Sequence, residues 1–105
     1  MKYMWKVHYN KDGYSGILKE GGTSRRTMIE KLAANMGGTV EAFYFAFGED
    51  DAILLADFPS NVDVAAIAMT VGAAGAASVT TTVLLTPEEI DQAMDKTVEY
   101  RAPGR

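Results

Sequence analysis

The stretch from Gly37 to Pro59 constrains the fold of this chain more than any other. It contains an aromatic-rich run, a Gly48-Glu49-Asp50-Asp51 turn and an aliphatic run ending at Pro59, a pattern that predicts a β-hairpin. Strand alternation places three phenylalanines on one side of the first run and its other apolar residues on the opposite side: Phe43, Phe45 and Phe47 against Val40, Ala42, Tyr44 and Ala46. Because neither side is clearly polar, we expect both sides of the hairpin to be covered.

Apolar spacing and end signals predict the remaining elements. In chain order these are a strand at 3–9, a turn at 10–13, a short helical turn at 14–20, a helix behind an N-cap at Thr23 or Ser24, the hairpin, a helix at 61–74 capped by Ser60, a strand at 76–85 and a last helix. That last helix begins at a capping box from Thr86 to Glu89, and we expect Ile90, Ala93, Met94 and Thr97 on one of its faces. The helix at 61–74 is apolar nearly all round, which predicts cover on more than one side.

This order of elements predicts an α+β fold, the ferredoxin-like βαββαβ arrangement with an added C-terminal helix. Residues 1–105 are then one domain with a four-stranded antiparallel sheet and two crossover helices on one face. The other sheet face would expose a large apolar patch in a monomer, so we expect a second copy of the chain to cover it. A homodimer or a higher homo-oligomer is therefore predicted.

Charge and composition exclude several partner classes. The net charge is −4, so no positive field attracts nucleic acid or an anionic membrane. The apolar segment 64–79 contains Gly72 and Gly75 and is shorter than the roughly 20 residues of a membrane span. The chain has no cysteine and its start does not resemble a signal peptide, which predicts a cytoplasmic protein without disulfides or thiolate metal sites.

Four stretches in the same order resemble the GYD domain family: GILKEGGTSRR at 16–26, EAFYFAFGEDDA at 41–52, TTVLLTPEEID at 81–91 and EYRAPG at 99–104. The resemblance implies membership of the dimeric α+β barrel group, in which ferredoxin-like sheets pair face to face. The family's Gly-x-Tyr-Asp signature corresponds to Gly48, Glu49, Asp50 and Asp51, so Asp50 stands where the family has tyrosine. The resemblance implies no particular reaction.

Four residues are the candidates for catalysis. His8 is the only histidine, and its ordinary pKa near neutrality suits a general base, although a strand-end histidine held by a hydrogen bond is the simpler interpretation. Lys6, Tyr44 and Asp57 occupy strand positions that can face a space between two sheets, where burial would shift their pKa values. Alternation can equally place some of them at the rim.

Two further clusters suggest ion binding. Thr23, Ser24, Arg25 and Arg26 follow two glycines at a helix start and form a candidate anion site, without the spacing of a known phosphate loop. The acids at 49–51 form a candidate site for a hard cation or a solvated turn. A single histidine argues against a catalytic transition-metal site, and we expect neither a metal nor a tightly bound cofactor.

Two functions remain open at this point. In the first, the protein is a noncatalytic oligomeric module that binds a small molecule or serves assembly. In the alternative, it is a cofactor-free enzyme, monooxygenase-like or isomerase-like, with a pocket between the sheet and a partner subunit. An open pocket with convergent polar groups between the sheets would favour the enzyme, and a closed, packed interface would favour the noncatalytic module.

Overall fold

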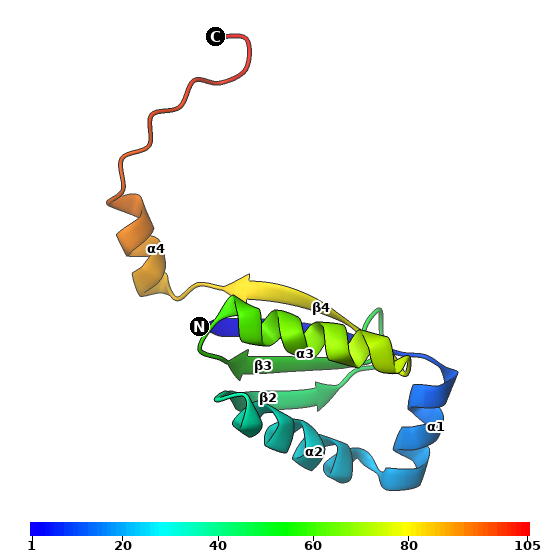
Figure 1. Cartoon of the computed structure of the whole chain (residues 1–105). Helices are drawn as coiled ribbons and strands as arrows, with labels where there is room; N and C mark the ends of the chain where they lie inside the picture. The colour runs from blue at the N-terminus through cyan, green and yellow to red at the C-terminus, as the bar shows by residue number, and fades with distance from the viewer.

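The computed structural model describes residues 1–105 as four strands and four helices (Figure 1). Their bounds in chain order are β1 (Lys2–Tyr9), α1 (Lys11–Glu20), α2 (Gly22–Asn35), β2 (Thr39–Phe45), β3 (Ala52–Asp57), α3 (Asn61–Ala74), β4 (Ala77–Leu84) and α4 (Pro87–Met94). The predicted bounds of α3 are confirmed, and the predicted strands are confirmed to within a few residues at their ends.

The strands form one antiparallel sheet in the order β2-β3-β1-β4. The pair α1 and α2 connects β1 to β2, and α3 connects β3 to β4. Buried side chains of α2 and α3 belong to the same core as those of the sheet, so both crossovers cover one face. This is the predicted ferredoxin-like fold with an added C-terminal helix, and the α+β class is confirmed.

The core lies between this helix-covered face and the two crossover helices. Alternating residues of β1 and β3 supply most of it, as the 2.0-residue period of a strand requires. The buried hydrophobic residues are Tyr3, Trp5, Val7, Ala33, Ala52, Leu54, Ala56, Phe58, Val64 and Ile67. Phe58 is its centre, with its ring centroid 5.4 Å from that of Trp5 and 6.4 Å from that of Tyr3.

A β-bulge in β2 corrects the predicted alternation of the hairpin. Val40 pairs with Ala56 and Ala42 pairs with Leu55, so one residue of β2 has no partner in the register. The extra residue reverses the alternation of side chains before and after the bulge. Val40 and Phe43 therefore both pack against the core, whereas strict alternation would place them on opposite faces. Phe47 is also not on that face, because β2 ends at Phe45 and Phe47 is fully exposed in the turn.

The first crossover is two helices, with starts that differ from those predicted. α1 begins at Lys11, three residues early, because the Asn10 side chain accepts a hydrogen bond of 3.0 Å from the backbone N–H of Gly13. Gly21 has a φ of 87° and both ends α1 and precedes α2. Thr23 and Ser24 therefore lie inside the first turn of α2 and do not cap it, because the preceding glycine has already redirected the backbone.

Helix α3 begins at the predicted cap, where the Ser60 side chain accepts a hydrogen bond from the backbone N–H of Asp63. Only Val64 and Ile67 of this helix are buried, whereas Val62 and Met69 are 77% and 74% exposed. Within one chain α3 is thus covered on one side, not on several as predicted, because the sheet and α2 reach only that side. No helix of the protein, α3 included, combines the length and apolarity that crossing a bilayer requires.

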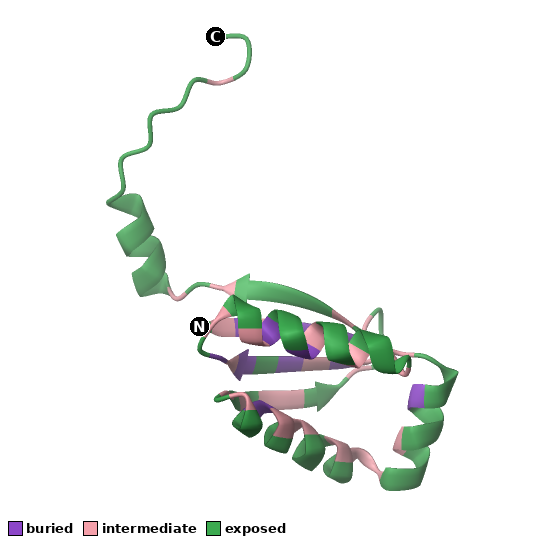
Figure 2. Cartoon of the chain, in the orientation of Figure 1, coloured by how far each residue is buried: buried purple, intermediate pink, exposed green.

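Helix α4 projects away from the sheet and is exposed throughout (Figures 1 and 2). Its capping box is as predicted, with the Thr86 hydroxyl accepting from the Glu89 backbone N–H at 3.1 Å and the Glu89 side chain accepting from Thr86 at 3.0 Å. The helix ends at Met94, so Thr97 lies outside the face predicted for it. The projecting segment explains a radius of gyration of 17.0 Å, against about 13 Å for a compact chain of this length.

Candidate functional site

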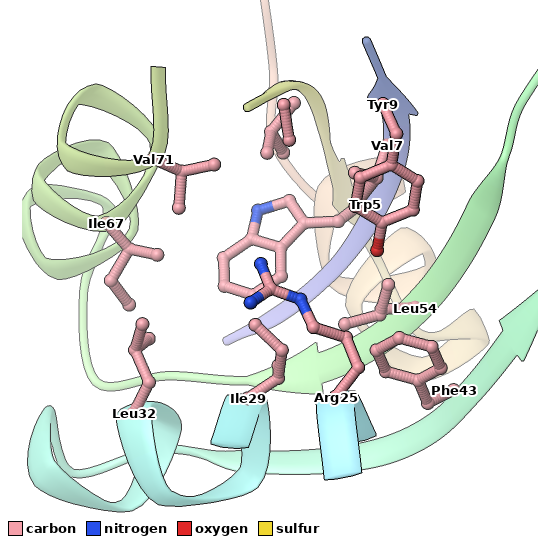
Figure 3. A pocket seen from close by; sticks show the side chains of 12 residues that line it. Trp5, Val7, Tyr9, Arg25, Ile29, Leu32, Phe43, Leu54, Ile67 and Val71 are labelled. Carbon is pink, nitrogen blue, oxygen red and sulfur yellow. The ribbon is translucent and has the colours of Figure 1, made fainter. Parts of the chain in front are cut away.

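A cavity lies between the helix-covered face of the sheet and the two helices α2 and α3 (Figure 3). All but one of its lining residues are hydrophobic or aromatic; the set is Trp5, Val7, Tyr9, Arg25, Ile29, Leu32, Phe43, Leu54, Ile67, Val71, Ala77 and Val79. The free space measures about 30 Å³, enough for one or two water molecules. We call this space the interhelical cavity.

Simple periodicities bring the lining residues together. Trp5, Val7 and Tyr9 point to one side of β1 because strand side chains alternate. Arg25, Ile29 and Leu32 follow the four-and-three spacing of one stripe of α2, so a cationic side chain continues an apolar stripe by one turn. The position of Arg25, four residues before Ile29, is the sequence signal for this cavity, because it places a cation on the core-facing stripe of α2; the predicted anion site does not include this spacing.

Two polar atoms at the cavity are buried without a partner. Trp5 is 4% exposed, and its indole Nε1 makes no hydrogen bond. The Nε of Arg25 is also buried and unpaired, and Figure 3 shows its side chain reaching from α2 toward the Trp5 indole. A buried donor without an acceptor costs roughly 1–3 kcal/mol, and native proteins contain few of them. These two atoms are the unsatisfied buried side-chain polar atoms of the whole chain.

Tyr9 supplies a third polar group at the cavity. Burial raises the pKa of its phenol, and the neighbouring Arg25 guanidinium opposes that effect. The phenol therefore stays protonated at neutral pH and is able to donate a hydrogen bond. The Tyr9 ring meets Tyr14 of α1 edge-on, with 5.7 Å between ring centroids, which holds it at the rim of the cavity.

The catalytic candidates of the sequence analysis lie elsewhere, on the sheet face that no helix covers. We call this the open face. Lys6 and Tyr44 fall in one cross-strand row on either side of Ile53, and Tyr44 is 71% exposed. Asp57 and His8 lie toward opposite ends of the face, since Lys2 is opposite Asp57 while His8 is near the other end of β1. The four side chains share a face but do not converge on one point.

Charge pairs engage two of these candidates. The α-amino group of Met1, 3.1 Å away, and Lys2 hold the pKa of Asp57 below its usual value. His8 is exposed, with Nε2 2.8 Å from the backbone oxygen of Glu49 and 3.2 Å from a carboxylate oxygen of Asp50. Asp50, which stands in place of the signature tyrosine, thus lies beside the histidine.

The acidic turn at 49–51 does not gather its carboxylates. Asp50 lies beside His8, whereas Asp51 accepts a hydrogen bond of 2.8 Å from the backbone N–H of Tyr9. The side-chain carboxylates therefore have separate partners, and no group of three or more histidine or acidic side chains in the chain is placed to hold a metal ion. Through Asp51, the turn between β2 and β3 is hydrogen-bonded to the end of β1 and to Tyr14 of α1.

Asp51 carries a pH-dependent contribution to stability. Hydrogen bonds from the Tyr14 phenol and from the Tyr9 backbone hold its pKa below the usual value of 3.8. A lowered folded-state pKa stabilises fully above the unfolded pKa, and the contribution is lost as pH falls through the folded pKa. We expect the melting temperature to fall as the pH drops below about 4, the ordinary pKa of an aspartate, and to fall less in Asp51→Asn. Melting curves across this range test the effect; an equal reduction in Asp91→Asn, on exposed α4, would contradict it.

The candidate anion site is divided by the structure. Thr23 and Ser24 line a shallow surface depression with Lys31, and Arg26 points to Glu30 at 3.9 Å. Arg25 instead reaches the interhelical cavity and forms no ion pair. Successive residues of an α-helix are rotated by about 100° around its axis, so the side chains of residues 25 and 26 face different surroundings.

The comparisons with known proteins agree with the fold. The sequence profile of the GYD domain matches residues 3–94, from β1 to the end of α4. No curated protein and no solved structure matches the chain. Because the profile covers most of the sequence, the chain belongs to the GYD domain family.

Proposed function

We propose that the protein is a noncatalytic homo-oligomeric module that binds a small molecule in the interhelical cavity. The observation that carries this proposal is the pair of unpaired donors, Trp5 Nε1 and Arg25 Nε, in an otherwise apolar space. A sequence that served only packing would gain stability by replacing these donors, since each unsatisfied group is unfavourable. Small-molecule sites in proteins share this composition, with apolar walls and a few placed polar groups.

The inventory of polar groups favours binding over catalysis. An indole N–H, a guanidinium and a protonated phenol all donate, and no carboxylate or histidine lines the cavity. General-base chemistry needs an acceptor within reach of the substrate. A cofactor-free enzyme with its pocket on the open face is the alternative; there Asp57 and His8 lie toward opposite ends of the sheet, so the four candidates do not act together on one small substrate.

Self-association through the open face is the second part of the proposal. Apolar side chains occupy the middle of this face, with Leu55 37% exposed and flanked in the register by Met4 and Ala42. The charges at one end are already paired within the chain, because Lys2 contacts both Glu41 and Asp57. A second copy could therefore cover this end without burying an unpaired charge. The resemblance to dimeric α+β barrels, whose sheets pair face to face, supports the open face as the interface. We expect the protein in the cytoplasm.

Native mass spectrometry tests both parts of the proposal. We expect a dimer or higher oligomer at micromolar concentration, with an additional small mass per subunit when desolvation is gentle. Leu55→Glu should give monomers, because it places a charge in the centre of the paired faces. Val62→Glu is the control, since Val62 is 77% exposed on the outer side of α3. A monomeric wild-type protein would contradict the assembly part. If Leu55→Glu and Val62→Glu had the same oligomeric state, the open face would not be the interface.

A further inference from the structure

The interhelical cavity leaves two buried hydrogen-bond donors without an acceptor, Trp5 Nε1 and Arg25 Nε, while the Tyr9 hydroxyl can both donate and accept. Its polar atoms are Trp5 Nε1, the Arg25 guanidinium and the Tyr9 hydroxyl. An indole N–H and a guanidinium cannot accept a hydrogen bond under any conditions of protonation found in proteins. A ligand that satisfies them must therefore present acceptor atoms, which excludes ammonium compounds.

The charge of the site is equally one-sided. Arg25 has no carboxylate within ion-pair distance, whereas its neighbour Arg26 pairs with Glu30. Asp12 and Glu20 line an adjoining hollow on the α1 side, which also borders Tyr9 and Arg25, yet neither forms an ion pair with Arg25. A guanidinium beside an apolar space is favourable when an anion joins it there, because the charge is then paired and hydrogen-bonded.

The number of cations sets the number of ligand charges. Arg25 is the only charged residue among those lining the interhelical cavity. One negative charge on the ligand would be compensated, and a second would be buried without a partner, which is strongly unfavourable. The walls formed by Ile29, Leu32, Ile67 and Val71 offer nothing to a polar substituent. The free volume of about 30 Å³ holds one or two water-sized groups, so even a short ligand enters only if α2 and α3 move apart, and a longer apolar chain requires a larger movement.

We propose that the ligand class of the interhelical cavity is a short-chain monocarboxylate, with its carboxylate hydrogen-bonded by Arg25 and Trp5 and its alkyl chain between α2 and α3. This inference rests on the proposed function, because it names the chemistry of the same cavity. A carboxylate is the planar anion that matches the fork of N–H donors on a guanidinium. The hollow on the α1 side shares Tyr9 and Arg25 with the cavity and provides a route of entry past the two residues.

The protein contains a single tryptophan, so its indole N–H gives one NMR signal that reports on this cavity alone. The probes are butyrate, its neutral isostere butyramide and the dianion succinate, each titrated into the full-length protein while the Trp5 indole signal is followed. We expect saturable shifts with butyrate and at least about tenfold weaker binding of butyramide and succinate, the size that loss of one buried charged hydrogen bond produces. Arg25→Gln should weaken butyrate binding about tenfold and remove the preference for acid over amide. Arg26→Gln should bind as the wild type does.

The outcomes separate this inference from the proposed function. Equal binding of butyrate and butyramide to the wild-type protein would overturn the carboxylate assignment while leaving a small-molecule cavity in place. The absence of any Trp5 shift with butyrate, butyramide and succinate would overturn both. An Arg25→Gln protein that keeps the acid preference would exclude Arg25 as the anion partner and so contradict the inference. The wild-type comparison of acid and amide stands even if that variant does not fold.

Discussion

Phe58→Ala is expected to lower the free energy of unfolding by about 3–5 kcal/mol, the range for removing a buried phenylalanine. Phe58 is 1% exposed and packs on both Tyr3 and Trp5, so its removal leaves a cavity in the centre of the core. Such a loss is a large part of the stability of a small domain. Urea unfolding followed by circular dichroism measures it, and Phe58→Leu, which retains most of the volume, should lie between the variant and the wild type.

Phe47→Ala is the matched control for this substitution. Phe47 is fully exposed in the turn after β2, so the same chemical change should alter the unfolding free energy by less than about 0.5 kcal/mol. The sequence alone assigned Phe47 to a strand face, which makes the pair a test of the structure as well. Comparable losses at the two positions would show that Phe47 is buried, contrary to the description given above.

Gly38→Ala is expected to destabilise the protein by about 1–3 kcal/mol, because the site has no room for a methyl group. A Cβ at Gly38 would lie 2.3 Å from the Phe58 Cδ1 and 2.7 Å from the backbone oxygen of Asp57. The first contact involves the most central ring of the core and the second involves backbone, so neither neighbour is free to move away. The chain must shift where α2 turns into β2.

Gly48→Ala provides the comparison in thermal or urea unfolding. Gly48 has open space where its Cβ would be and no positive φ, so alanine should be tolerated there with little change. If Gly38→Ala were as stable as Gly48→Ala, the close approach of Phe58 to the start of β2 would be wrong. Both variants replace glycine by alanine, so the entropy that alanine removes from the unfolded chain is the same in both and cancels in the comparison.

Local signals explain why so much of the fold was predictable. Alternation in β1, the Ser60 cap of α3 and the capping box of α4 each involve residues within a few positions of one another. Such signals act through backbone hydrogen bonds that form irrespective of the rest of the protein. The order of the resulting elements then leaves few topologies open, among them the one observed.

The errors arise where distant parts of the chain decide the structure. The bulge between Val40 and Ala42 depends on how β2 pairs with β3, and no residue type in β2 predicts it. Propensity and spacing do not include such pairings. The early start of α1, by contrast, has a local cause, the cap from Asn10 to Gly13, in a segment that the sequence pattern marks only as a turn.

The candidate site was predictable only in pieces. Arg25 was assigned to an anion site on the strength of its neighbours, but its direction comes from the stripe of α2 that faces the core. Strand alternation puts Trp5 on the same side of β1 as Val7 and Tyr9, yet a sequence cannot reveal that its N–H lacks a partner, because that depends on what α2 and α3 leave unfilled. Unsatisfied atoms are properties of packing.

Strand β1 is the second strand from one edge and separates two different surfaces. Its odd-numbered residues Trp5, Val7 and Tyr9 line the interhelical cavity, and its even-numbered residues, such as Lys6, belong to the open face. The parity of a position along β1 therefore decides which property a substitution there alters directly, ligand binding or self-association. A backbone shift in this strand would move both sets of side chains together. Ligand binding in the cavity and self-association through the open face are therefore connected through a single layer of backbone.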